Sequence, residues 1–210
     1  MAQAADLENP DFKPGKAIGT LVGIMVVGRI VGIAVAFAIY SLGKTEAYDA
    51  KISVLKDSEL GYLYFAVFSI SVLVQWLNMF PTYLKSKIFK ADAGNVRANM
   101  FLYKVNDGGS NSPPVVLEEG GGVGEYNRAN RSMHHFNENS LGVVTCVLLA
   151  GYVFPLPVMI LTLVFAIGRV LHQLGYSKGY GKHAPGFVLA MIGMLSLEML
   201  VFLAAVKSFT

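Results

Sequence analysis

The stretch Phe154-Pro155-Leu156-Pro157 interrupts a run from Phe136 to Tyr176 that is otherwise mostly apolar. A helix needs roughly 20 apolar residues to cross the hydrocarbon layer of a membrane, and this run is about twice that length. Two prolines so close together remove backbone donors and force the chain to turn. The sequence therefore predicts a hairpin of two membrane-spanning helices.

Three further apolar runs lie outside this hairpin. They cover residues 17–42, residues 60–80 just before Pro81, and residues 185–206. The chain is 54% hydrophobic and only 15% charged, whereas soluble domains carry about a quarter charged residues. We therefore predict an all-α integral membrane protein with five spans. A net charge of +3 is too small to indicate a nucleic-acid partner.

The segments between the spans suggest the organisation of the chain. Residues 1–16 mix acidic and basic side chains, unlike a secretory signal with its basic start, so we expect the first span to be retained. Residues 1–56 would form a tail, an extra helix and a loop, and residues 57–210 a four-helix domain. Within it, residues 105–126 are rich in glycine and acid, which predicts a flexible loop rather than a phosphate-binding one.

Basic residues concentrate in the segment between the second and third spans and in the turn between the fourth and fifth. By the positive-inside rule, these segments and the N-terminus face the cytosol or its equivalent. Membrane lipids are therefore expected partners. The endoplasmic reticulum, the outer mitochondrial membrane and other organelle membranes all fit this pattern.

Polar side chains gather on two helix faces near the predicted cytosolic side. Arg131, His135 and Glu138 occupy positions i, i+4 and i+7 and so share a face, with Arg128 close by. A second face, at the end of the fourth span, is made of Arg169, His172 and Tyr176. Guanidinium groups bind carboxylates bidentately and a glutamate can hold an ammonium group, so together these faces suit a small zwitterionic or anionic ligand.

Simpler interpretations of these residues remain open. Arg128 and Arg131 would also serve as anchors that reach the lipid headgroups, and Glu138 as their ion-pair partner. Tyr176 suits an interfacial aromatic anchor. We predict no metal site, because nothing in the spacing requires the histidines and Glu138 to converge.

Two charges lie deeper in the predicted spans. Arg29 is near the middle of the first span and Glu198 near the middle of the last. Each alone would cost roughly 3 kcal/mol at the bilayer centre. We therefore predict that they form an intramembrane pair that docks the extra N-terminal helix onto the other four.

The two polar faces resemble motifs of the family of membrane-associated proteins in eicosanoid and glutathione metabolism (MAPEG), most closely its microsomal glutathione S-transferase 3-like branch. Arg131 and Glu138 keep the seven-residue interval that opens the family's second core helix, and Arg128 matches an arginine three residues earlier. Gly168-Arg169-Val170-Leu171 and Gly175-Tyr176 resemble the third core helix. The chain departs from these motifs at Asn127, Ser132, His135 and His172. Met100, Phe101 and Leu102 also stand where the family has a run of basic residues.

The resemblance implies a four-helix MAPEG-type unit that assembles as a homotrimer and binds glutathione, as a co-substrate, between neighbouring subunits. The positions carried over as glutathione contacts are Arg128, Arg131, His135, Glu138, Arg169 and Tyr176. The family activates the thiol with an arginine near the end of its first core helix, and Arg97 is the nearest candidate here.

Two functions follow from the resemblance. The first is a glutathione-dependent transferase or peroxidase that acts on lipophilic electrophiles or lipid hydroperoxides. The second is a non-catalytic protein of the same fold, acting as a structural subunit or scaffold of a larger membrane complex. Arg131, Glu138, Arg169 and Tyr176 favour the enzyme. His135, His172 and the replaced basic run favour the scaffold.

Overall fold

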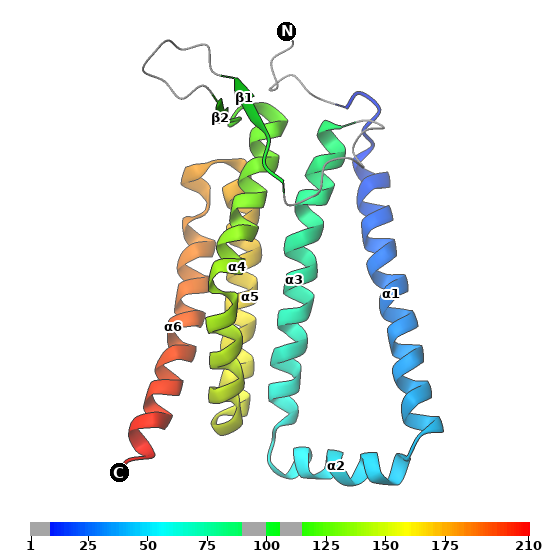
Figure 1. Cartoon of the computed structure of the whole chain (residues 1–210), viewed down its shortest axis with the longest axis vertical. Helices are drawn as coiled ribbons and strands as arrows, with labels where there is room; N and C mark the ends of the chain where they lie inside the picture. Colours follow the sequence, from blue (N-terminus) through cyan, green and yellow to red (C-terminus); the bar gives the residue numbers. More distant parts are fainter. Residues whose placement is uncertain (1–8, 90–99, 106–114) are drawn as a thin grey trace.

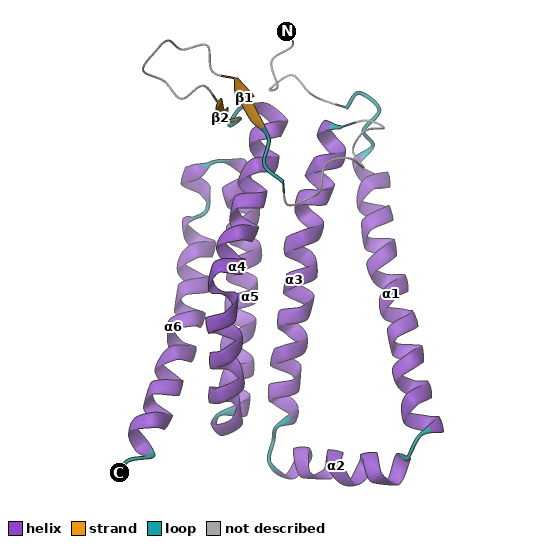
Figure 2. Cartoon of the chain, in the orientation of Figure 1, coloured by secondary structure: helices purple, strands orange, loops and turns teal. Residues whose placement is uncertain are grey.

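The computed structural model describes residues 9–89, 100–105 and 115–210. Within these ranges the chain forms six α-helices, a two-stranded hairpin and a short 3-10 helix (Figures 1 and 2). The elements are listed here with their bounds: α1 (Pro14–Leu42), α2 (Thr45–Asp57), α3 (Gly61–Ile88), β1 (Tyr103–Val105), β2 (Val115–Leu117), α4 (Gly121–Val153), α5 (Pro155–Lys178), η3 (Tyr180–Lys182) and α6 (Ala184–Lys207).

The all-α membrane fold predicted from the sequence is confirmed. Helices α1, α3, α5 and α6 are each long and apolar enough to span a membrane. Of the five predicted spans, the one that begins at Phe136 is not among these four helices. It forms only the second half of α4, whose first half is rich in polar residues, and α4 runs alongside α5 and α6 (Figure 1). The predicted turn at Phe154 and Pro155 joins α4 to α5. The protein is therefore an integral multi-pass membrane protein.

The core of the bundle lies between α3, α4, α5 and α6. A second cluster extends this core at the end near β1 and β2, where Leu84 and Ile88 of α3 pack against Val123, Tyr126 and Ala129 of α4. This packing explains why α3 continues through Pro81, which was predicted to end the span. The buried residues beyond the proline gain contacts that outweigh the loss of one backbone hydrogen bond.

Within the segment predicted as a flexible loop over 105–126, the structure describes residue 105 and residues 115–126. Strands β1 and β2 pair antiparallel, and α4 begins at Gly121. Asn127, 1% exposed, holds the start of α4 against the segments that precede the two strands and the helix. Its side chain forms hydrogen bonds with the backbone of Leu102 and with the carbonyl oxygen of Glu118. A side chain at Gly124 would overlap the Glu119 carbonyl. The glycine run thus lets the chain fold back onto the start of the helix.

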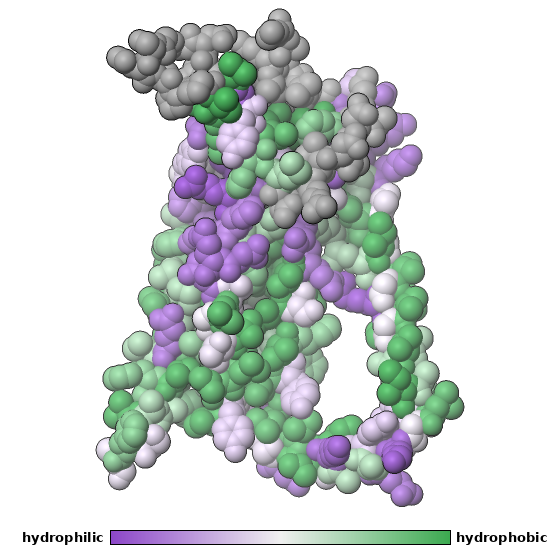
Figure 3. Space-filling view, viewed as in Figure 1, coloured by the Kyte–Doolittle hydropathy of each residue, from purple (hydrophilic) through white to green (hydrophobic). Residues whose placement is uncertain are grey.

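The N-terminal helices α1 and α2 pack against the bundle less closely than the other helices pack against one another. Helix α2, predicted as a loop, runs between the ends of α1 and α3 that lie opposite the β-hairpin and joins the two helices (Figure 1). Helix α1 packs only lightly against α3, and none of its residues is buried. Figure 3 shows an open gap between the part of α1 nearer to α2 and the rest of the molecule.

Helices α5 and α6 approach each other at glycines. A Cβ at Gly168 would overlap the backbone of Ala190, and a Cβ at Gly186 would overlap the backbone of His172. Close approach at small residues is a common means of packing helices in membranes, where dispersion contacts replace the hydrophobic effect.

We predict that Gly168→Ala lowers the stability of the folded bundle by about 1–3 kcal/mol, because the added methyl group must displace the backbone of α6. Thermal unfolding of the detergent-purified protein measures the change. Gly142→Ala is the matched control, since a Cβ there meets no atom within 4 Å. Equal stability of the two variants would contradict the close contact.

Candidate functional site

A buried polar cluster links α5 to α4 near the end of the bundle that carries the β-hairpin. The Arg169 guanidinium, 3% exposed, donates through Nη2 to the Ser132 carbonyl oxygen at 2.7 Å. Its Nη1 lies 3.0 Å from Nδ1 of His135. Because a guanidinium only donates, His135 accepts at Nδ1, and its neutral ring therefore carries the proton on Nε2.

The neighbouring positions on α5 extend this cluster. His172 Nδ1 lies 2.8 Å from the Ser132 hydroxyl. One residue on, Gln173 is fully buried and donates to the Leu77 carbonyl oxygen of α3 at 2.9 Å. A polar side chain buried in a membrane bundle needs such internal partners. The α5 side chains therefore fix how α3, α4 and α5 sit against one another.

Tyr176 belongs to an aromatic group at the end of α5. Its ring stacks on His172, with centroids 5.6 Å apart and an interplanar angle of 10°. Tyr180 and His183, from the segment between α5 and α6, meet the Tyr176 ring edge to face. This group packs the turn before α6 against the polar cluster.

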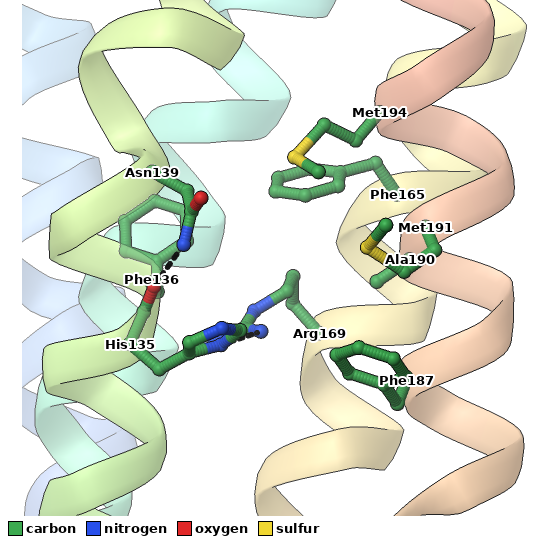
Figure 4. A pocket seen from close by; sticks show the side chains of 9 residues that line it. All are labelled: His135, Phe136, Asn139, Phe165, Arg169, Phe187, Ala190, Met191 and Met194. Atoms are coloured by element: carbon green, nitrogen blue, oxygen red, sulfur yellow. Dashed lines mark hydrogen bonds between the residues drawn. The ribbon is translucent and has the colours of Figure 1, made fainter.

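Beside the Arg169–His135 contact lies a small pocket between α4, α5 and α6 (Figure 4). Its volume is about 180 Å³, and its lining residues are His135, Phe136, Asn139, Phe165, Arg169, Phe187, Ala190, Met191 and Met194. Sites for drug-sized ligands measure roughly 300–1,000 Å³. The pocket is therefore too small to enclose a tripeptide such as glutathione within one chain, although it fits an apolar group.

The predicted site residues separate into three groups. His135 and Arg169 come together at the pocket, and Tyr176 is linked to them through His172. Arg128 instead bonds the backbone, donating to the carbonyl oxygens of Ser177 at 3.0 Å and Glu119 at 2.9 Å.

Arg131 and Glu138 form the third group. Both are exposed on α4, and neither makes a hydrogen bond or ion pair with any residue that the structure describes. They still share a helix face with His135, as the spacing predicts. Arg97, the candidate thiol-activating residue, lies outside the described residues.

The predicted Arg29–Glu198 pair does not form within one chain. Arg29 donates through Nη2 to Oε1 of Gln75 on α3 at 2.7 Å. Glu198 is exposed on α6, which lies on the other side of the bundle from α1 (Figure 1). The sequence places both charges in spans but does not show which helix each span adjoins.

Sequence reasoning missed Ser132 and Gln173 as members of the polar cluster. Gln173 stands four residues after Arg169 in an apolar helix, so the spacing already placed both on one buried face. Ser132 gave no such signal, because it accepts from Arg169 through its backbone carbonyl oxygen, and its hydroxyl meets His172 of another helix.

The segment that matches a known family coincides with the helices around this site. The MAPEG family matches residues 63–206, more than half of the chain, and the match runs from α3 to α6. The chain belongs to the MAPEG family. Neither a curated protein nor a solved structure matches it. MAPEG membership indicates a membrane function related to glutathione or eicosanoid metabolism, and α1 and α2 precede the matched unit.

One contact outside the spans predicts a pH effect. The Tyr180 hydroxyl donates to the Glu119 carboxylate, and this hydrogen bond, together with partial burial and the negative charge, raises the pKa of Tyr180 above its usual value. The neutral phenol is thus favoured in the folded state. Its contribution to stability is complete below pH of about 10 and is lost as the pH rises through the raised pKa.

We predict that Glu119→Gln lowers the Tyr180 pKa toward the value of a free tyrosine. Nuclear magnetic resonance of ring-labelled tyrosine, assigned with Tyr180→Phe, measures the titration. Glu59→Gln, at the opposite end of the bundle, is the control and leaves the Tyr180 pKa unchanged. An unaltered titration in Glu119→Gln would mean that the contact does not form.

Proposed function

We propose that this MAPEG protein is a glutathione-dependent membrane transferase or peroxidase of the microsomal glutathione S-transferase 3-like type, acting on lipophilic electrophiles or lipid hydroperoxides. The observation that carries the proposal is the exposed pair Arg131 and Glu138 beside the His135–Arg169 contact. Arg131, His135 and Glu138 share one face of α4. Arg169 of α5 meets that face at His135, beside the pocket.

The charges of the exposed face fit glutathione. The tripeptide carries two carboxylates and one ammonium group. Arg131 offers a bidentate donor for a carboxylate, and Glu138 an acceptor for the ammonium group. Both side chains are exposed and unbonded among the described residues, so binding costs no internal contact.

The pocket next to this face fits the apolar part of the reaction. Phe187, Met191 and Met194 of α6 line it opposite His135 and Arg169 (Figure 4). Methionine side chains adapt to ligands of varied shape. A lipophilic substrate arriving from the bilayer would place its apolar end here, while its reactive atom meets the glutathione thiolate at the rim.

Arg169 suits a role in holding the thiolate. Its buried Nε has no hydrogen-bond partner among the described residues, and its charge faces the pocket wall. A positive charge in a water-poor site favours a thiolate over a thiol. Arg97 is a second proposed activating residue, on the basis of the family motif alone.

Two reactions are consistent with this arrangement. In conjugation, the thiolate sulfur attacks an electrophilic carbon and forms a C–S bond, and the leaving group departs with the electron pair. In peroxide reduction, two glutathione molecules give up two electrons and two protons and become the disulfide, while the hydroperoxide becomes an alcohol and water.

Glutathione is larger than the pocket, so we propose that a second subunit completes its site, as in a homotrimer. Arg131 and Glu138 point away from the bundle core and are placed to face such a neighbour. This arrangement requires that binding and assembly be lost together when the shared face is disrupted.

A non-catalytic subunit of a membrane complex is the second candidate. The Arg128 guanidinium and Nη2 of Arg169 donate hydrogen bonds to backbone carbonyl oxygens, and such contacts stabilise the fold rather than bind a ligand. Helix α1 also leaves most of its surface uncovered. These two features favour a protein that assembles with partners without turnover.

We predict that the detergent-purified protein binds glutathione with a micromolar-to-millimolar Kd, and that Arg131→Ala and Glu138→Ala each weaken binding at least tenfold. Each variant removes one charge-assisted contact, worth about 1.5–3 kcal/mol. Isothermal titration calorimetry measures the Kd. Lys178→Ala removes an exposed charge at the same end of the bundle and serves as the control.

Turnover then separates the two candidates. An enzyme consumes glutathione with an aryl chloride or a lipid hydroperoxide, and the scaffold binds partners with no turnover. Absence of glutathione binding in a folded sample would contradict the proposed function.

A further inference from the structure

Two charges within the spans have no opposite charge in the part of the chain that the structure describes. Arg29 on α1 donates to Gln75 and to the Met25 carbonyl oxygen, and both acceptors are neutral. Glu198 on α6 is exposed and makes no ion pair or hydrogen bond with any described residue. Uncompensated charges inside a membrane are unfavourable and usually meet a partner.

The two charges lie at the same depth. Helices α1 and α6 both begin at the end of the bundle that carries the β-hairpin and run in the same direction (Figure 1). Arg29 lies 15 residues after Pro14, and Glu198 lies 14 residues after Ala184. At about 1.5 Å per residue, both side chains sit about 21–23 Å from the start of their helices.

Arg29 lines a groove between α1 and α3. The groove measures about 860 Å³ and also contains Gln75 and Asn78 of α3. On α1 it is lined by Gly28 and Gly32, where an added Cβ would meet no atom within 4 Å. This small-xxx-small pair is therefore unoccupied within the chain and offers a surface on which another helix can pack closely.

Glu198 stands on a helix face that fits such a groove. Leu195 and Phe202, one turn before and one turn after it, are 45% and 63% exposed. The outer face of α6 thus presents one carboxylate between apolar side chains. The groove presents one guanidinium between apolar and small side chains. The two surfaces match in charge, polarity and depth.

We propose that the groove between α1 and α3 holds α6 of a second copy of this chain, with Arg29 of one copy paired to Glu198 of the next. The contact joins different surfaces of the two copies, so repeating it around an axis normal to the membrane gives a closed ring when the rotation between neighbours divides a full turn. Helix α1 then packs against α6 of the neighbouring subunit on the side opposite α3. The carboxylate joins Gln75 at the guanidinium and neutralises its charge.

Cross-linking between tagged copies tests this contact in native membranes. One copy carries Ile33→Cys, at the groove one turn below Arg29, and the other carries Phe202→Cys, one turn below Glu198. Both have Cys146→Ala, which removes the native thiol. Mild oxidation is expected to give a disulfide-linked pair bearing both tags. Ala34→Cys, on the opposite side of α1, is the matched control and gives at most a tenth of that product.

Charge exchange tests the pairing itself. Arg29→Glu and Glu198→Arg are each expected to reduce the tagged pair recovered in detergent at least tenfold, and the double exchange restores it. The proposal is overturned if the Ile33→Cys and Ala34→Cys copies give equal amounts of disulfide-linked product, or if neither gives any. It is also overturned if the double exchange restores nothing while both single variants remain folded by circular dichroism. Glutathione binding is not used as the readout, so this result stands apart from the proposed function.

Discussion

The hydrogen bonds of the α5 polar side chains are the constraint on which the rest of the structure depends. Inside a membrane no water is available to satisfy Arg169, His172 and Gln173, so each must find a partner within the protein. They take these partners from Ser132 of α4 and the Leu77 carbonyl oxygen of α3. Three helices are thereby set in one register, and glycine contacts add α6 to them. The pocket is a consequence of this packing, because it lies where Arg169 meets His135.

The same constraint distinguishes the charges that serve the fold from those that serve assembly or binding. Arg128 is held by backbone carbonyls and stabilises the bundle. Arg169 serves both purposes, because its Nη2 bonds the Ser132 carbonyl oxygen while its Nε has no partner among the described residues. Arg131, Glu138 and Glu198 are exposed and have no partner among the described residues. The proposed glutathione site and the proposed contact between copies use these remaining charges. Each charge therefore gains an oppositely charged partner only when a ligand or a neighbouring copy binds.

Much of the fold could be predicted from the sequence, because length and hydropathy are local properties. The hairpin at Phe154 and Pro155 and the last span follow from them directly. The continuation of α3 past Pro81 and the start of α4 at Gly121 could not be predicted, since both depend on packing between distant segments. Helix α2 was missed because it is short and polar.

The site was predicted only in part, for a related reason. Helical spacing shows which side chains share a face, and α4 is helical over Arg131, His135 and Glu138. It does not show what a face contacts. Arg29 bonds Gln75 rather than Glu198 because α1 adjoins α3. Arg169 bonds a backbone carbonyl oxygen, and such a partner cannot be recognised from the type of residue that carries it.

The central claim is that each chain is completed by a second copy and by glutathione. Native mass spectrometry of the full chain, released from detergent with and without glutathione, tests it most directly. The account predicts an oligomer that carries bound glutathione. A folded monomer that binds no glutathione would contradict it.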